Sequence, residues 1–195
     1  MIHYYTNREI SEKLEINLAR WKRWSRSFLP PDPLGGMQSG YARQYVFEDL
    51  FKIFLGGHLL SHLKLPVPDS QQVLADLSPW LKKNGFFDLN GANGVGSEKA
   101  VQSNDSRIYF SPLSPAGSKG GSGFRYLIRK TVSIQSVASA TCQQIMETFE
   151  ETIIHSDVPD GFVFLQDSGV RMINLTALFA VLVEKLRAVQ LAVSV

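Results

Sequence analysis

The sequence predicts an α+β chain made of three segments, and three observations support this division. Apolar residues recur at three- and four-residue spacing near the N-terminus, with polar residues placed to cap helices, and predict a helical domain over residues 1–85. A shift to Gly, Asn, Ser and Pro predicts a flexible Gly/Ser-rich linker over residues 86–123. Alternating β-favourable and helical patterns then predict a small α+β domain over residues 124–195 that ends in an apolar helix.

The first helix is expected to begin at Asn7. Thr6 is followed three residues later by Glu9, and this pair can satisfy two free backbone donors reciprocally as a capping box. Ile10 and Leu14 are four residues apart and fall on one face of the predicted helix. The helix is therefore short and packs through a single stripe.

A second, basic helix is expected from Leu18 to Phe28, with Asn17 as its N-cap. Trp21 and Trp24 belong to its apolar stripe, and large aromatic residues at helical spacing are usually buried in a core. No acidic residue interrupts its other faces, which carry Arg20, Lys22, Arg23 and Arg26. Such a helix suits a nucleic-acid groove lined by phosphates, while the alternative is the solvated face of an ordinary core helix.

A β-wing is expected to follow the basic helix. Pro30 and Pro31 must end that helix, because proline lacks the backbone donor. A glycine-rich tip follows, and then residues 41–46 alternate as a strand does, with Arg43 at the base of the wing. Acidic residues at positions 48 and 49 favour the start of a third helix.

This order of elements resembles the winged helix-turn-helix of the MerR family of transcription regulators. The matching residues are Tyr5-Thr6 with Glu9-Ile10, Trp21-Lys22-Arg23-Trp24, Phe28-Leu29-Pro30-Pro31, Gly40-Tyr41 with Arg43 and Tyr45, and Glu48-Asp49-Leu50. The likeness covers about the first third of the chain and continues weakly to Leu81. Phe28 stands where the family usually has glycine, and the 41–45 segment is one residue longer than usual.

The resemblance implies a sequence-specific regulator that binds double-stranded DNA as a homodimer and distorts promoter DNA. It places Asn17, Arg20, Lys22 and Arg23 at the major groove or its flanking phosphates, with Tyr41 and Arg43 on the DNA backbone. Arg26 extends the same basic surface and completes the expected DNA-binding set. RNA polymerase is a further candidate partner.

Charge supports this placement. Residues 17–45 contain five Lys and Arg residues against Asp32 alone, whereas residues 65–195 contain eleven against twelve Asp and Glu. The 195-residue chain is 44% hydrophobic, has no visible secretory signal, and its longest apolar stretch is too short to span a bilayer. With Cys142 as its single cysteine, it forms no intramolecular disulfide, and we expect a cytoplasmic protein.

The third helix is predicted over residues 47–65. Gly56-Gly57 within it indicates close packing against a neighbouring helix. His58 and His62 are four residues apart, but no third ligand is evident, so we expect no metal site and no cofactor. A fourth helix is expected over residues 70–83 with a break near Leu77-Ser78, because Pro79 lies inside it, and Asn84-Gly85 should end it.

Only residues 107–110 look like a strand within the linker. After it, residues 124–137 favour β structure, and residues 138–155 predict an amphipathic helix with Cys142, Ile145, Met146, Phe149 and Ile153 on one side. A β-hairpin is expected from residues 162–165 and 170–173 around a turn at 166–169.

Asn174 is expected to cap a last helix that runs from Leu175 to about Val193. Its apolar stripe keeps near-heptad spacing, and further apolar residues lie on its other faces. We interpret it as a dimerisation element, since groove readers commonly pair about a two-fold axis. The alternative is that it completes the core of its own domain.

We find no pattern for catalysis and expect a protein that is not an enzyme. Two other functions remain open from the sequence. One is an excisionase-like DNA-architecture protein of a phage or plasmid, which would bend DNA without a promoter response. The other is a protein-interaction or small-molecule-binding module, whose binding to nucleic acid would be insensitive to salt.

Overall fold

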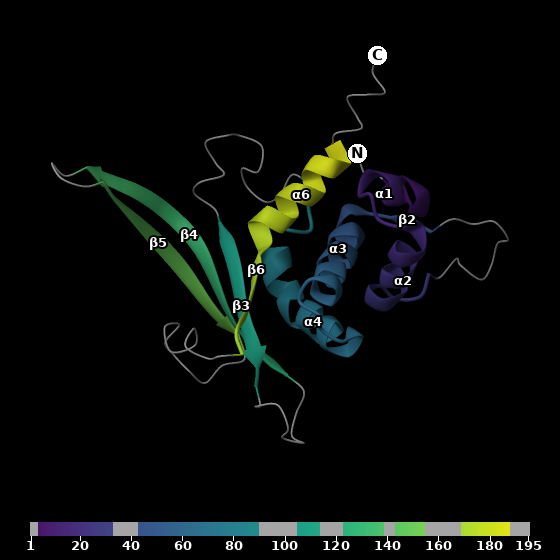
Figure 1. Ribbon diagram of the computed structural model, residues 1–195, viewed down its shortest axis with the longest axis horizontal. Helices are drawn as coiled ribbons and strands as arrows, with labels where there is room; N and C mark the ends of the chain where they lie inside the picture. Colours follow the sequence, from purple (N-terminus) through teal and green to yellow (C-terminus); the bar gives the residue numbers. More distant parts are fainter. Residues whose placement is uncertain are drawn as a thin grey trace, which may run out of the picture. The chain divides into compact units, whose positions relative to one another are not determined.

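The computed structural model describes residues 4–32, 43–89, 105–113, 123–138, 143–154 and 169–187. The chain forms two compact units, one of Met1–Ala92 with Phe179–Val195 and the other of Asn93–Leu178. Helices and antiparallel sheets are both present (Figure 1), so the α+β class predicted from the sequence is confirmed. The unit boundaries differ from the predicted ones, because a strand inside the expected linker belongs to the second unit and most of the last helix belongs to the first.

The first two helices begin where their caps predict. Helix α1 spans Asn7–Lys13, and the Thr6–Glu9 capping box is formed in both directions. Helix α2 spans Leu18–Phe28, and the amide oxygen of Asn17 accepts hydrogen bonds from the backbone N–H groups of Ala19 and Arg20. In both cases a side chain satisfies donors that the first helical turn leaves free.

A short antiparallel pair joins the start of α1 to the segment that precedes α3. Strand β1, Tyr5–Thr6, pairs with β2, Gln44–Tyr45. Helix α3 follows as Phe47–Ser61, and the Asp49 carboxylate accepts a hydrogen bond from the Val46 N–H at 3.4 Å. Burial raises the pKa of Asp49, and this hydrogen bond opposes part of the rise. The third helix therefore begins as its acidic first turn predicts.

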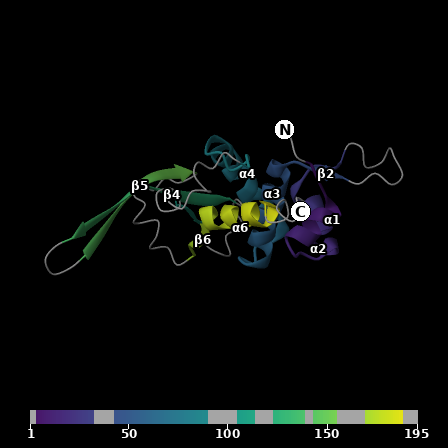
Figure 2. The same ribbon diagram turned by 90° about the horizontal axis from the view of Figure 1, so that it is seen from above.

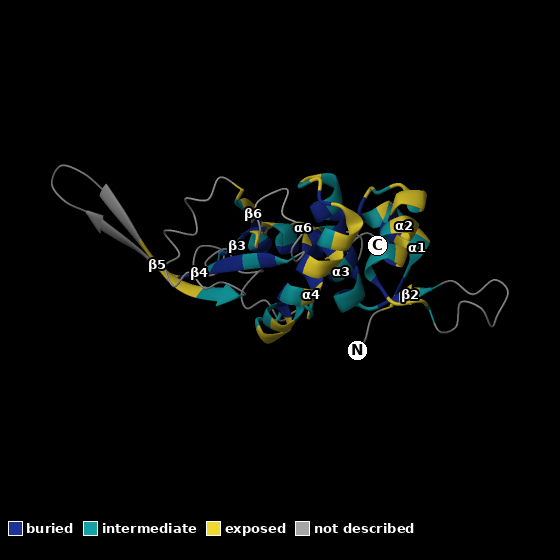
Figure 3. Ribbon diagram, turned by 90° about the horizontal axis from the view of Figure 1, so that it is seen from below, coloured by how far each residue is buried: buried dark blue, intermediate teal, exposed yellow. Residues whose placement is uncertain are grey.

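The two glycines of α3 are sites of close packing, as predicted. A Cβ added to Gly56 would lie 2.6 Å from the ring of Phe28, and one added to Gly57 would lie 2.4 Å from the ring of Trp24. Both aromatic residues come from α2. The absence of side chains at these two positions of α3 thus allows α2 to approach it closely, and α3 is largely buried (Figure 3).

Helix α4 spans Val67–Lys83 and continues through Pro79, so the break expected near Leu77-Ser78 is absent. Proline removes the hydrogen bond that would reach the Ala75 carbonyl, but Ala75 is exposed and its carbonyl can bind water instead. Asn84 ends the helix, and Gly85 then adopts a φ of 78°, which glycine tolerates without strain.

Helix α6, Leu175–Arg187, completes the core of the first unit. The Asn174 side chain accepts a hydrogen bond from the Ala177 N–H, as predicted for its cap. The Phe179 ring lies 5.7, 5.6 and 5.4 Å from the rings of Phe47, Phe51 and Phe86, and the helix runs beside α3 (Figure 2). These contacts support the alternative that the helix packs into the core of its own chain.

The second unit contains a four-stranded antiparallel sheet in the order β5-β4-β3-β6. The strands are β3, Ser106–Pro112, β4, Phe124–Ala138, β5, Gln143–Ile154, and β6, Arg171–Asn174. The strands predicted at 107–110 and 124–137 are therefore confirmed. The buried core of this sheet includes Ile108, Phe110, Tyr126, Ile128 and Ile173.

The amphipathic helix predicted over residues 138–155 is wrong, because residues 143–154 form strand β5. The segment pairs residue by residue with β4, and this ladder places Glu151 opposite Arg129 and Glu150 opposite Lys130. The Arg129 guanidinium bonds the Glu151 carboxylate at 2.5 Å. Non-local pairing of this kind overrides the helical spacing of the apolar residues, one of which, Phe149, remains 40% exposed.

Several expectations fall on residues outside the described ranges. They are the linker glycines from Gly91 to Gly121, Cys142, the strand expected at 162–165 and the end of the last helix beyond Arg187. Strand β6, which was expected in a hairpin, pairs with β3 in the described structure. No helix among the described residues has both the length and the apolar character needed to cross a membrane.

Candidate nucleic-acid interface

Helix α2 has one buried face and a broad exposed basic face. With 3.6 residues per turn, its exposed arc has a crest and two flanks. Ala19 and Arg23 lie on the crest, Lys22 and Arg26 lie on the flank nearer to β2, and Arg20 lies on the opposite flank. All five residues are exposed, while Trp21 is fully buried. The helix is therefore oriented with its cations outward, and the core position predicted for Trp21 is confirmed.

The cations of this face are not neutralised within the described structure. Arg20, Lys22, Arg23 and Arg26 take part in none of the ion pairs found among the described residues. The Arg26 Nε–H donates a hydrogen bond to the backbone carbonyl of Lys22 at 3.3 Å, and this neutral acceptor does not compensate the positive charge. An uncompensated cluster of this kind attracts polyanions.

Asn17 differs from the other predicted contact residues. Its side-chain oxygen accepts hydrogen bonds at 2.9 and 3.3 Å from the backbone N–H groups of the first turn of α2. The side chain is exposed, but its acceptor is engaged in the helix cap. Asn17 therefore fixes the start of α2, and only its amide N–H groups remain for an external contact.

Tyr45 ties α1, α2 and β2 together beneath this surface. Its hydroxyl lies 2.9 Å from the Ser25 Oγ and donates a hydrogen bond to the Asn7 Oδ1 at 2.8 Å. The Tyr45 ring is buried and packs edge-on against Trp21, with ring centroids 5.9 Å apart. The position of β2 relative to α2 is thus set by both hydrogen bonds and aromatic packing.

An open depression of about 1140 Å³ lies between the start of α1, the flank of α2 and the segment around β2. Four cations line it together with one carboxylate, that of Asp32, so the depression is cationic overall; the cations are Arg8, Lys22, Arg26 and Arg43. Sequence reasoning missed Arg8, because its proximity to Arg43 follows from the pairing of Thr6 with Gln44, which are far apart along the chain. In the sequence around Arg8, the only indication of such a role is that an exposed arginine stands beside the capping box.

Arg43, predicted at the base of the wing, is described, whereas the tip of the wing at residues 33–42 lies outside the described residues. Arg43 directly precedes β2, and its guanidinium lies over the Tyr45 ring, 5.6 Å from the centroid. Stacking of this kind orients the planar guanidinium while its N–H donors stay available. Tyr41, the other predicted wing contact, lies outside the described residues.

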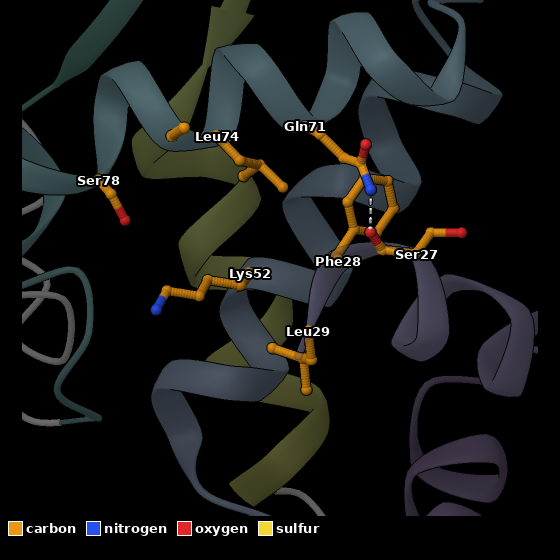
Figure 4. A pocket seen from close by; sticks show the side chains of 8 residues that line it. Ser27, Phe28, Leu29, Lys52, Gln71, Leu74 and Ser78 are labelled. Atoms are coloured by element: carbon orange, nitrogen blue, oxygen red, sulfur yellow. Dashed lines mark hydrogen bonds between the residues drawn. The ribbon is translucent and has the colours of Figure 1, made fainter. Parts of the chain in front are cut away.

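A second, smaller depression of about 370 Å³ shows how the end of α2 is anchored (Figure 4). Gln71 of α4 donates a hydrogen bond from its side chain to the Ser27 carbonyl at 2.6 Å. That carbonyl belongs to the last turn of α2, whose acceptors have no partner within the helix. Together with the packing of Phe28 on Gly56, this bond holds the C-terminal end of the basic helix.

Two histidines lie next to each other at the end of α3, His58 in the helix and His62 at its C-cap. The rings of His58 and His62 stack with centroids 4.7 Å apart. Burial lowers the pKa of His58, and the nearby His62 lowers it further. The described residues contain no group of three or more His, Cys, Asp or Glu side chains placed to hold a metal.

The described geometry thus brings together five of the seven predicted DNA contacts, namely Arg20, Lys22, Arg23, Arg26 and Arg43, on or beside one helix. It assigns Asn17 to the cap of that helix and adds Arg8 to the cationic depression. Comparison with known families and with curated proteins gave no match to this sequence.

Proposed function

We propose that this chain is a sequence-specific regulator that binds double-stranded DNA through a MerR-like winged helix-turn-helix. The observation that carries the proposal is the exposed basic face of α2, whose cations form no ion pair with the residues that the structure describes and whose helix is anchored at both of its ends. An α-helix with its side chains is about 10–12 Å in diameter, which matches a major groove that is about 12 Å wide, and α2 has eleven residues to lie along it.

The crest of α2 suits contact with base edges. Ala19 has a small side chain, so it lets the helix backbone approach the floor of the groove. Arg23 lies one turn further along the same crest, and a guanidinium can donate two hydrogen bonds to the O6 and N7 of guanine. We therefore assign sequence reading to Arg23 before any other cation.

The flanks of α2 suit contact with phosphates. Lys22 and Arg26 face the depression that Arg8 and Arg43 also line, so four cations converge on one side of the helix. Arg20 lies on the other side, where the second DNA strand would pass. Contacts of this kind supply affinity and salt dependence but little sequence information.

The test is electrophoretic mobility of labelled double-stranded DNA, taken from fragments around the gene itself, over a salt series with excess competitor. We expect specific retention that weakens as salt rises. Arg23→Ala should cost about 1–3 kcal/mol and relax specificity at one base pair. Lys22→Ala and Arg43→Ala should weaken binding to all sequences and reduce the salt slope by about one each.

Lys82→Ala is the matched control, because it removes the same charge from the exposed end of α4, away from α2. It should leave specificity unchanged. A chain that retains no DNA at low salt would refute the proposal, as would equal effects of the Lys82 and Arg23 substitutions. Promoter fusions would then separate activation from repression and from simple bending of DNA.

A further inference from the structure

The hairpin of β4 and β5 continues beyond the rest of its sheet (Figure 1). Strand β3 pairs with β4 only from Phe124 to Lys130, and the last hydrogen bond on that side among the described residues runs from the Thr131 N–H to the Asp105 carbonyl at 2.8 Å. The register then shifts between Thr131 and Ser133, as at a β-bulge. From residue 133 to residue 138, β4 pairs with β5 alone among the described strands.

Among the residues that the structure describes, this part of β4 therefore has an open edge. One side of its backbone is bonded to β5, and no described strand satisfies the N–H and C=O groups on the other side. A two-stranded ribbon is only marginally stable in water, and an unpaired edge is a template for another strand. Proteins usually protect such edges with charged side chains or proline.

The sequence places no such protection on the ribbon. Residues 131–146 include no Asp, Glu, Lys, Arg or Pro, although Arg129 and Lys130 directly precede them and Glu147 directly follows. The other edge of the hairpin is different, because the stretch of β5 that pairs with residues 133–138 of β4 includes Glu147, which is exposed. The two edges of one hairpin therefore differ in charge.

Pairing with a second copy depends on this difference. When a strand pairs antiparallel with its own copy about a two-fold axis, one residue lies opposite itself, and every residue lies on the same face as its copy. Identical charges near the axis then meet, and like charges opposite one another destabilise a strand pair. Pairing through the matching stretch of β5 would place Glu147 and its copy in one strand pair, whereas pairing through residues 133–138 of β4 would bring no charges together.

We propose that residues 133–138 of β4 form an antiparallel strand pair with the same residues of a second copy of this chain. The paired segment is about 20 Å long and would make one continuous sheet in the order β5-β4-β4-β5. The dimer would carry two copies of the basic helix α2. The interface is independent of DNA binding, because it involves no residue of the first unit.

The test is the mass of the full chain by sedimentation equilibrium, without DNA, from about 1 μM to 1 mM, which covers weak to moderate association. We expect the wild-type chain to dimerise. Ser136→Lys and Ser136→Glu place like charges on one face of the interface, within one residue pair of the axis, and each should weaken the dimer roughly fivefold or more. An equimolar mixture of the two variants should restore association through opposite charges.

Thr148→Lys is the control, because β5 lies two strand spacings, about 10 Å, from the β4 of the second copy. It should leave the dimer intact. Recovery in the mixture also shows that both Ser136 variants are folded. A wild-type chain that is monomeric at 1 mM would overturn the proposal, and so would a dimer that neither Ser136 substitution weakens.

Discussion

Replacement of Gly57 by Ala tests how α2 is held against α3. Gly57 lies inside α3, and an added Cβ would stand 2.4 Å from both Cε3 and Cζ3 of Trp24. Carbon atoms in contact normally lie about 3.5–4.0 Å apart, so the indole ring or the whole of α2 must move by roughly 1 Å. The substitution therefore sets helix propensity against packing.

The two effects have opposite signs. Ala in place of Gly stabilises a helix interior by about 1 kcal/mol. Insertion of a methyl group into a packed contact costs about 1–3 kcal/mol. Trp24 is only partly buried, so its ring can yield to some extent, and we expect Gly57→Ala to lower the free energy of unfolding by about 1 kcal/mol.

Urea unfolding followed by circular dichroism measures this change. The decisive comparison is the same substitution made in a Trp24→Ala background, where the added methyl group meets no ring. There Gly57→Ala should raise the free energy of unfolding by about 1 kcal/mol through helix propensity alone. If Gly57→Ala stabilises the protein whether or not Trp24 is present, the packing argument is refuted.

Three further predictions concern stability. Tyr45→Phe removes the hydroxyl that links Ser25 and Asn7. Because Ser25 is buried, the substitution should lower the free energy of unfolding, measured in urea, by about 1–2 kcal/mol. Tyr4→Phe, at an exposed position, should leave it unchanged. Folding lowers the pKa of His58, so the folded state resists protonation of this side chain. The melting temperature should therefore fall as the pH drops below about 6.5, the pKa of an unperturbed histidine. His58→Gln should make this fall smaller. Phe179→Ala leaves a cavity in an aromatic cluster and should cost about 3–5 kcal/mol by thermal or urea unfolding; a loss below about 1 kcal/mol would contradict the packing described for α6.

The features predicted correctly from the sequence are those whose cause is local. Thr6, Asn17 and Asn174 cap helices because a side-chain oxygen can reach backbone donors two or three residues away, whatever the rest of the chain does. The glycine pair of α3 is a similar case, since only a close neighbour explains two adjacent glycines in an otherwise apolar helix. The basic face of α2 follows from periodicity alone.

The features that were missed depend on distant partners. The segment of β5 has apolar residues at helical spacing, but its twelve residues pair antiparallel with β4, which lies earlier in the chain. Charge pairing across the two strands, such as Glu151 with Arg129, gives no signal within a short window. Arg8 was overlooked for the same reason, because its place in the cationic depression depends on the pairing of β1 with β2. Contacts that strand pairing creates between distant residues are therefore the main features that could not be predicted from the sequence.

Helix α6 contacts the turn between α1 and α2 in the proposed DNA-binding unit. Glu15, in the turn between α1 and α2, has a φ of 54°, a left-handed conformation that costs an L-residue about 1–2 kcal/mol. Lys185 of α6 bonds its carboxylate at 2.5 Å and lowers its pKa, while the Lys13 Nζ donates to the Leu186 carbonyl. Because α6 also covers the aromatic cluster of α3, residues 1–85 alone lack part of their core. The N-terminal unit therefore cannot complete its packing until α6, about 90 residues further along the chain, has been synthesised, which its own sequence segment does not indicate.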